Sequence, residues 1–197
     1  LNNLQSVDKD LFFSNNYDLT DLNALLNLDY VNGNIAICDN NDLTSIEALS
    51  NINPSSVKNL QITGNESLSN CAVESICNYL SSPGGSISIY SNSTNCNSPV
   101  EIAEICGFHI PCLPYGNYFF FSQSDIDDFQ NNYRECTTLQ GDVTITGNDI
   151  TNLNGLNVIT QIGHNLIIRN NPLLGNLSGF DSVDVIGGGL ELYSNPN

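Results

Sequence analysis

The sequence is short of basic residues, and this excludes one large class of partner. Only four of its 197 residues are Lys or Arg, against 21 Asp or Glu, so the formal net charge is −17. Proteins that bind nucleic acid draw their affinity from clustered Lys and Arg side chains. The four basic residues here are far apart: Lys9, Lys58, Arg134 and Arg169. We therefore expect no binding to nucleic acid.

Methionine, tryptophan and long apolar runs are also missing. No apolar run approaches the roughly 18 residues that a membrane span needs, so no membrane span is expected. Leu1 does not open a basic and apolar secretory signal, which indicates a mature or internal stretch of chain. Charged residues are only 13% of the sequence, and its polarity comes instead from 32 asparagines.

Motifs for catalysis and for cofactor or metal binding are absent as well. The sequence has no HExxH, Gly-x-Ser-x-Gly, P-loop or dinucleotide-binding fingerprint. Its two histidines, His109 and His164, are isolated, and the acidic group Asp125, Asp127 and Asp128 lacks the Gly and terminal Glu of an EF-hand. We therefore expect no catalytic residue, no cofactor and no metal site, and we interpret the chain as non-enzymatic.

A short motif, apolar-x-apolar-x-x-Asn, recurs seven times. Its first apolar residues follow one another at steps of 24, 25 and 27 in the first half of the chain and of 23 and 24 in the second half. The motif's asparagines are Asn16, Asn40, Asn65, Asn92, Asn148, Asn171 and Asn195. The alternating apolar residues predict a strand of three to five residues in each repeat.

After most of these asparagines, apolar residues recur at every third position, as in Leu19, Leu22, Leu25 and Leu28. This period predicts an extended or 3₁₀-like return path rather than an α-helix. A turn of about 24 residues would then add one strand to a parallel sheet and bury its leucines against neighbouring turns. An Asn side chain both donates and accepts hydrogen bonds, so we interpret the seven asparagines as a stacked ladder that satisfies the bends.

Six of the seven cysteines lie in one window, without the CxxC spacing of a zinc ribbon. Residues 72–81 predict an amphipathic helix, and Pro99 is expected to open a second one. Cys71 precedes the first of these helices and Cys96 precedes the second, while Cys77 and Cys106 lie on the two helices. Among 15 possible pairings we therefore favour Cys71–Cys96, Cys77–Cys106 and Cys112–Cys136. Reduced, buried thiols are the alternative. Cys38 stands apart, as a half-buried filler or a point of intermolecular crosslinking.

The helices and disulfides predict a cap in the middle of the chain. Residues 1–107 would be the C-terminal part of one solenoid with its cap, 108–136 a linker and an N-terminal cap, and 137–197 the N-terminal part of a following solenoid. The prolines of 107–117 indicate the linker, and Ser124 is expected to cap a helix that follows it. Since Asn197 can be joined to Leu1 in phase, we also hypothesise that 112–197 and 1–106 of a next copy form one lobe of a tandem array.

The strand motif with its Asn resembles leucine-rich repeats. Residues 141–188, GDVTITGNDITNLNGLNVITQIGHNLIIRNNPLLGNLSGFDSVDVIGG, are similar to the receptor L-domain family, and the resemblance covers 1–92 and 137–197. It implies a right-handed, mainly β repeat solenoid with one parallel sheet and short disulfide-bonded helical caps. A parallel β-helix is the alternative fold. The family has no catalytic residue to carry over, and secreted bacterial surface proteins contain similar arrays.

Outward positions of the strands are poor in carboxylates and include large side chains typical of interfaces. The candidate binding face comprises Phe12, Tyr90, Ile167, Arg169 and Tyr193. We therefore expect a non-catalytic, extracellular or cell-surface module for adhesion or recognition of a protein or glycan, with possible self-association or tandem copies. A structural filament without a ligand and a glycan-active β-helix enzyme are the alternatives. Three sequons occur, at Asn65, Asn92 and Asn176; the first two are ladder positions and are expected to carry no glycan.

Overall fold

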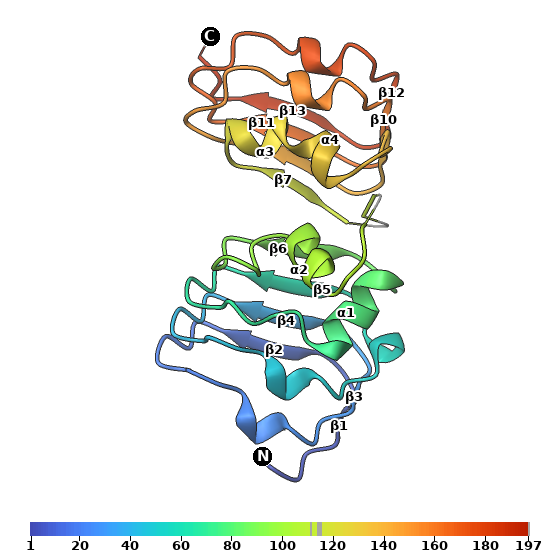
Figure 1. The fold of residues 1–197 in the computed structure, drawn as a ribbon. Coiled ribbons are helices and arrows are strands. Elements are labelled where there is room, and N and C mark those ends of the chain that lie inside the picture. The colour runs from blue at the N-terminus through green and yellow to red at the C-terminus, as the bar shows by residue number, and fades with distance from the viewer. Residues whose placement is uncertain (111, 114–115, 197) are drawn as a thin grey trace. The chain divides into compact units, whose positions relative to one another are not determined.

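A computed structural model describes residues 1–110, 112–113 and 116–196, and consists mostly of parallel strands in several small sheets, with few and short helices (Figure 1). The chain divides into two compact units, Leu1–His109 and Ile110–Asn197. Two prolines of the expected linker, Pro111 and Pro114, lie outside the described residues, as does Asn197. The assignment of 1–107, 108–136 and 137–197 to parts of two solenoids stays a prediction.

In the first unit, the repeated motif forms a four-stranded sheet in the order β2 (Leu11–Ser14), β4 (Ile35–Cys38), β5 (Leu60–Thr63) and β6 (Ile87–Tyr90). Every pair is parallel, and Leu11, Ile35, Leu60 and Ile87 lie in register across the sheet. Each strand therefore pairs with the strand of the next repeat. In β5, Leu60 and Ile62 are buried and Gln61 between them is exposed, so the period-two pattern separates an inner from an outer face there, whereas all four residues of β4 are buried.

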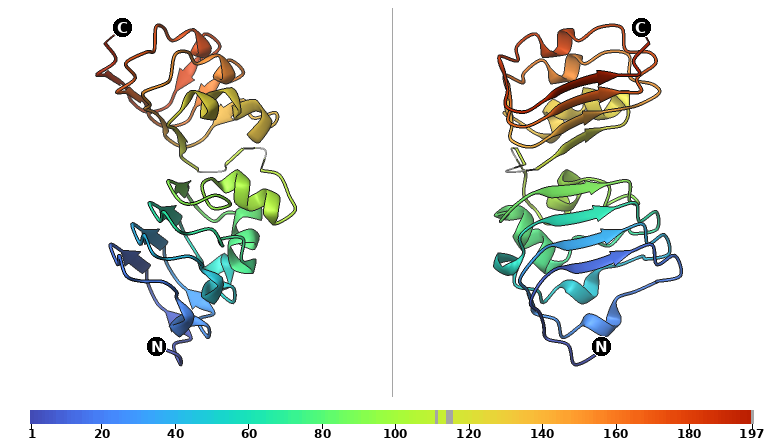
Figure 2. Two further views of the ribbon diagram at one scale, coloured as in Figure 1. Left: turned by 60° about the vertical axis from the view of Figure 1, so that its left-hand side comes forward. Right: turned by 180° about the vertical axis from the view of Figure 1, so that it is seen from behind.

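The second unit repeats this arrangement in the order β13 (Leu190–Tyr193), β11 (Leu166–Arg169), β9 (Val143–Ile145) and β7 (Tyr118–Phe120), again all parallel (Figure 2). The expectation of one parallel sheet was too simple, because each unit also has a smaller parallel sheet. These two-residue strands are β1 (Ser6–Val7) with β3 (Tyr30–Val31), and β8 (Thr138–Leu139), β10 (Gln161–Ile162) and β12 (Val185–Ile186). Two residues are too few to show a period of two in the sequence.

Short 3₁₀ helices form in the segments that return from one strand of the larger sheet to the next. They span Asn23–Leu25, Glu47–Leu49, Pro54–Ser56, Asn154–Leu156 and Ser178–Phe180. One residue in three points inward, as Leu22, Leu25 and Leu28 do, and all three are buried. This is the physical origin of the spacing, because a 3₁₀ helix has three residues per turn.

Four α-helices are described: α1 (Glu74–Ser81), α2 (Pro99–Ile105), α3 (Gln123–Asp127) and α4 (Phe129–Asn132). The two helices expected near residues 72–81 and after Pro99 are therefore present. The expected cap at Ser124 was wrong: Ser122 is the N-cap of α3, and its hydroxyl accepts from the Asp125 amide while the Asp125 carboxylate accepts from the Ser122 amide. This reciprocal capping box satisfies two amides, which a cap at Ser124 would leave exposed.

Three disulfides join Cys71 to Cys96, Cys77 to Cys106 and Cys112 to Cys136, the pairs expected from the sequence. Such bonds are typical of oxidising, extracellular compartments. The seventh cysteine, Cys38, is a free thiol and is buried. Among the described residues, every helix is too short or too polar to cross a membrane.

Candidate binding surface

Asparagine side chains stack along the end of the first unit's sheet. The backbone amide of Asn16 donates to Oδ1 of Asn40 at 3.1 Å. In the same way, the backbone amide of Asn40 donates to Oδ1 of Asn65 at 3.0 Å, and that of Asn65 to Oδ1 of Asn92 at 3.0 Å. Each Nδ2 also donates to the next Oδ1, at 2.9 to 3.2 Å. Asn40 and Asn65 are completely buried. Asn40 and Asn65 therefore each satisfy the bend of the preceding repeat in a region that water does not reach.

The ladder ends on a residue that the sequence reasoning missed. Asn92 has no further repeat to donate to, and its amide donates instead to Oδ1 of Asn97 at 3.1 Å, in the segment before α2. Asn97 thereby takes the place of a next ladder asparagine. Its own amide donates to the Glu101 carboxylate of α2 at 2.9 Å, which ties the ladder to the cap.

In the second unit, Asn171 and Asn195 repeat the ladder geometry, but Asn148 does not. Asn171 donates to Oδ1 of Asn195 from both its amide, at 3.0 Å, and its Nδ2, at 2.9 Å. Asn148 is exposed, and the amide of Gly147 occupies the acceptor on Asn171, at 2.9 Å. The interpretation of Asn148 as a ladder residue was therefore wrong.

A difference in backbone conformation explains why Asn148 turns outward. The residue before each of the other six ladder asparagines has a positive φ, between 53° and 69°; these are Asn15, Asp39, Gly64, Ser91, Asn170 and Ser194. This left-handed bend turns the next side chain back under the sheet. Gly147 could adopt it at the least cost of any residue, yet its φ is not positive.

A second polar row, which the sequence reasoning missed, lies at the opposite end of the strands. It comprises the residue before each strand: Asp10, Asn34, Asn59 and Ser86 in the first unit, and Asn117, Asp142, Asn165 and Gly189 in the second. Oδ1 of Asp10 accepts from the Asn34 amide at 2.7 Å, and Oδ1 of Asn165 accepts from the Gly189 amide at 2.7 Å. The signal was present, because all eight positions hold Asn, Asp, Ser or Gly.

On the outer face of the first unit, this row borders a hollow of about 330 Å³. Phe12 projects beside it with 65% of its surface exposed. Seven of the lining residues carry polar side chains or the aromatic ring: Asp10, Phe12, Asn34, Asn59, Gln61, Ser86 and Ser88. The hydrogen bonds that hold Asn34, Asn59 and Ser86 in place preorganise this surface.

The five candidate binding residues do not form one patch. Phe12 lies on β2 and Tyr90 on β6, at opposite edges of one sheet with β4 and β5 between them. In the second unit, Ile167 and Arg169 lie on β11, and the guanidinium of Arg169 donates to the hydroxyl of Tyr193 on β13 at 3.0 Å. The structure therefore brings together Arg169 and Tyr193, but it separates Phe12 from Tyr90.

The free thiol of Cys38 lies in the first unit's sheet, in register with Ser14 and Thr63. Burial, and secondarily the negative charge of Asp39, raise the pKa of this thiol above its usual range, against a lowering hydrogen bond with Thr63. A thiol that is buried and protonated is a poor nucleophile. Its surroundings therefore favour the role of a small filler over that of a crosslinking point.

Within the described parts of the chain, no three His, Cys, Asp or Glu side chains are grouped to hold a metal ion. His109 and His164 are both exposed. The chain matches no protein-family model, no curated protein and no solved structure.

Proposed function

We propose that this chain is a non-catalytic, extracellular recognition or adhesion module, built as a right-handed solenoid of the leucine-rich-repeat or L-domain kind. Support for this architecture comes from the pairing of each long strand with the strand one repeat away, at steps of 23 to 27 residues. Such stacking buries a continuous core between repeats and presents one row of outward side chains per sheet position.

The observation that carries a binding function is the hollow beside Phe12. A largely exposed aromatic ring next to fixed amide and carboxylate groups suits a polar, uncharged ligand, because rings stack on apolar faces while amides exchange hydrogen bonds with hydroxyl or peptide groups. With a net charge of −17, the protein repels strongly acidic ligands. A neutral glycan or an uncharged peptide segment fits these features best.

The same hollow gives no support to a glycan-cleaving function. Among its lining residues, Asp10 carries the one carboxylate, and Oδ1 of that group is already bonded to the Asn34 amide. Glycoside hydrolysis ordinarily needs two carboxylates, roughly 5 to 9.5 Å apart.

The test is binding to a printed array of neutral and acidic oligosaccharides, with an array of uncharged peptides in parallel. Phe12→Ala and Gln61→Ala are expected to weaken binding by at least about tenfold, the effect of losing roughly 1.4 kcal/mol of contact. Leu26→Ala is the matched control, because Leu26 is 50% exposed and does not line the hollow. If all three variants bind equally well, the hollow is not the contact surface. If the protein binds acidic glycans alone, the proposed ligand class is wrong.

A further inference from the structure

The floor of the hollow beside Phe12 is formed by the two central strands of the first unit's sheet. Ala36 on β4 lies between Phe12 on β2 and Gln61 on β5 in one row of the register. Its methyl group is the smallest of the three side chains, so the surface is recessed over β4. The volume of about 330 Å³ is at the lower end of the roughly 300–1,000 Å³ typical of small-molecule sites. The hollow therefore suits a compact ligand unit.

An extended peptide has little to bind to in this hollow. Because β4 pairs with β2 on one side and with β5 on the other, its backbone groups are used within the sheet. Peptides that add to a sheet bind to an exposed edge strand and place alternate side chains in pockets. Among the lining residues, Ile35 and Leu60 are buried in the core, and Phe12 is the one exposed large apolar side chain.

One donor and one acceptor at the rim of the hollow are held in place with unused hydrogen-bonding capacity. The backbone amide of Asn34 donates to Oδ1 of Asp10 at 2.7 Å, and Oδ1 of Asn34 accepts from Nδ2 of Asn59 at 2.8 Å. Among the described residues, Nδ2 of Asn34 and Oδ2 of Asp10 have no hydrogen-bond partner. The bonds that fix both side chains therefore leave an N–H donor and a carboxylate oxygen for a ligand.

The corresponding aspartate of the second unit has the same unused oxygen, although strands of the sheet lie on both sides of it. Oδ1 of Asp142 accepts from the backbone amide of Asn165 at 3.0 Å and from its Nδ2 at 2.9 Å. The backbone amide of Asp142 donates to Oδ1 of Asn117 at 2.9 Å. Within the described part of the chain, Oδ2 of Asp142 has no partner. An aspartate in this row therefore bonds through one oxygen whether or not a preceding strand is present.

The chemistry of these groups matches hydroxyls better than peptide groups. Gln61 donates from Nε2 to the Thr63 hydroxyl at 3.4 Å, and among the described residues its Oε1 and the hydroxyl of Ser88 have no partner. A hydroxyl both donates and accepts, whereas a peptide N–H only donates and a carbonyl only accepts. Adjacent hydroxyls of a sugar ring can therefore bind a donor and an acceptor together, while the C–H face of the ring packs on Phe12.

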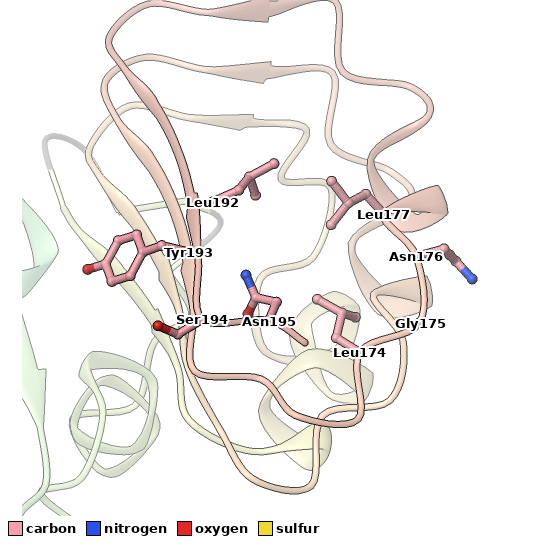
Figure 3. A pocket seen from close by; sticks show the side chains of 8 residues that line it. All are labelled: Leu174, Gly175, Asn176, Leu177, Leu192, Tyr193, Ser194 and Asn195. Carbon is pink, nitrogen blue, oxygen red and sulfur yellow. The ribbon is translucent and has the colours of Figure 1, made fainter. Parts of the chain in front are cut away.

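A second hollow, of about 310 Å³ beside Leu192 in the second unit, lacks this combination. In Figure 3, the side chains of Leu192 and Leu177 point toward each other across it, while Tyr193 and Asn176 point away from it. Sugar hydroxyls placed between the two leucines would lose their hydrogen bonds to water without gaining new ones. The contrast assigns hydroxyl recognition to the hollow beside Phe12.

From these features we propose that the ligand unit of this hollow is one neutral sugar ring with adjacent hydroxyl groups. The ring lies over Ala36, its C–H face contacts Phe12, and its hydroxyls bind Oδ2 of Asp10 and Nδ2 of Asn34. Ala36 determines specificity, because a larger side chain there would occupy the place of the ring. This assignment rests on the proposed recognition function and narrows its ligand class to sugars.

Filling the hollow tests where the ring lies. Ala36→Ile adds a β-branched side chain that suits a strand, and it is expected to weaken binding to neutral glycans on the array by at least about tenfold. Thr144→Ile is the matched control, because Thr144 occupies the corresponding position on β9 and does not line the hollow. The control should bind as the parent chain does. Equal binding by Ala36→Ile and Thr144→Ile would overturn the proposal.

Exchanging the donor and the acceptor tests the chemistry of the ligand. The double variant Asp10→Asn with Asn34→Asp keeps the net charge and both Oδ1 acceptors that fix the two side chains. Sugar hydroxyls can reverse their hydrogen bonds, so glycan binding is expected to stay within about threefold of the parent value. Peptide groups cannot reverse, so a ligand of that class should lose about tenfold or more. A tenfold loss of glycan binding in the double variant would contradict the assignment.

Periodate oxidation tests the need for adjacent hydroxyls, because it cleaves the carbon–carbon bond between them. After periodate and borohydride treatment, the neutral glycans of the array are expected to lose at least about tenfold in binding, while mock-treated glycans keep it. If binding weakens in Phe12→Ala but survives periodate, or if peptides alone bind, the sugar assignment fails and the recognition function stands. If Phe12→Ala binds as the parent chain does, the recognition function of the hollow fails as well.

Discussion

Asn65 is the residue at which the ladder's contribution to stability can be measured most sharply. Its Oδ1 accepts from the backbone amide and the Nδ2 of Asn40. Its Nδ2 donates to the carbonyls of Ile37 and Thr63 and to Oδ1 of Asn92. Asn65→Ala removes all five bonds in a completely buried site. The Nδ2 of Asn40 keeps its bonds to Phe13 and Cys38, but the Asn40 amide loses its one acceptor.

The magnitude follows from what is left without a partner. A buried amide without an acceptor costs about 1–3 kcal/mol, and each lost hydrogen bond contributes about 0.5–1.5 kcal/mol more. The remaining groups keep other partners, so we expect the free energy of unfolding of the first unit to fall by about 2–4 kcal/mol. Asn148→Ala is the matched substitution at an exposed position, where a change within about 0.5 kcal/mol is expected.

Urea denaturation followed by circular dichroism provides the measurement. Because Leu1–His109 and Ile110–Asn197 are separate compact units, we expect the Asn65→Ala loss in one transition, with the other at the parent midpoint. Asn65→Asp separates the two roles of the side chain, because it keeps an acceptor for Asn40 but removes the donor to Ile37, Thr63 and Asn92. It should be at least as destabilising as Asn65→Ala. If Asn65→Ala and Asn148→Ala lower stability equally, the ladder does not stabilise this fold.

Three further predictions use groups outside the ladder. Burial raises the pKa of Tyr79 to about 12. The stabilisation that the neutral Tyr79 side chain gives the fold is therefore complete below pH 10, its pKa in the unfolded chain, and is lost as the pH rises through 12. In a Cys38→Ser background, Tyr79→Phe should flatten the fall of the melting temperature over this pH range. Mild reduction should open Cys77–Cys106 before Cys71–Cys96, because the first disulfide is half-buried and the second is buried. Alkylation of the released thiols and mass spectrometry give the order of opening, and the reverse order would contradict the prediction. Iodoacetamide should modify Cys38 far more slowly at pH 8 in the folded chain than in urea; equal rates would contradict its burial.

Much of the fold was predictable because each repeat carries its own signal. Two apolar residues and an asparagine at fixed spacing locate a strand and its bend, and the step between repeats gives the register, as in Leu11 with Ile35 and Leu60. The same register correctly places Arg169 beside Tyr193, because both occupy one outward column in consecutive repeats.

What escaped prediction depends on backbone conformation rather than residue type. Asn148 matches the motif exactly as Asn171 does, but the φ of the preceding residue decides whether its side chain turns inward. The two-residue strands of the smaller sheets have no period of their own. Asn97 could not be predicted from the repeat spacing, because it follows Asn92 by only five residues. It accepts the hydrogen bond that the asparagine of a next repeat would otherwise accept.

The hydrogen bonds of the two polar rows that flank each strand run in opposite directions along the stack of repeats. After the strand, an amide donates forward to the side chain of the next repeat, as Asn40 does to Asn65; before the strand, an amide donates back to the preceding side chain, as Asn34 does to Asp10. The hydrogen-bond polarity of the two rows therefore holds consecutive repeats in register.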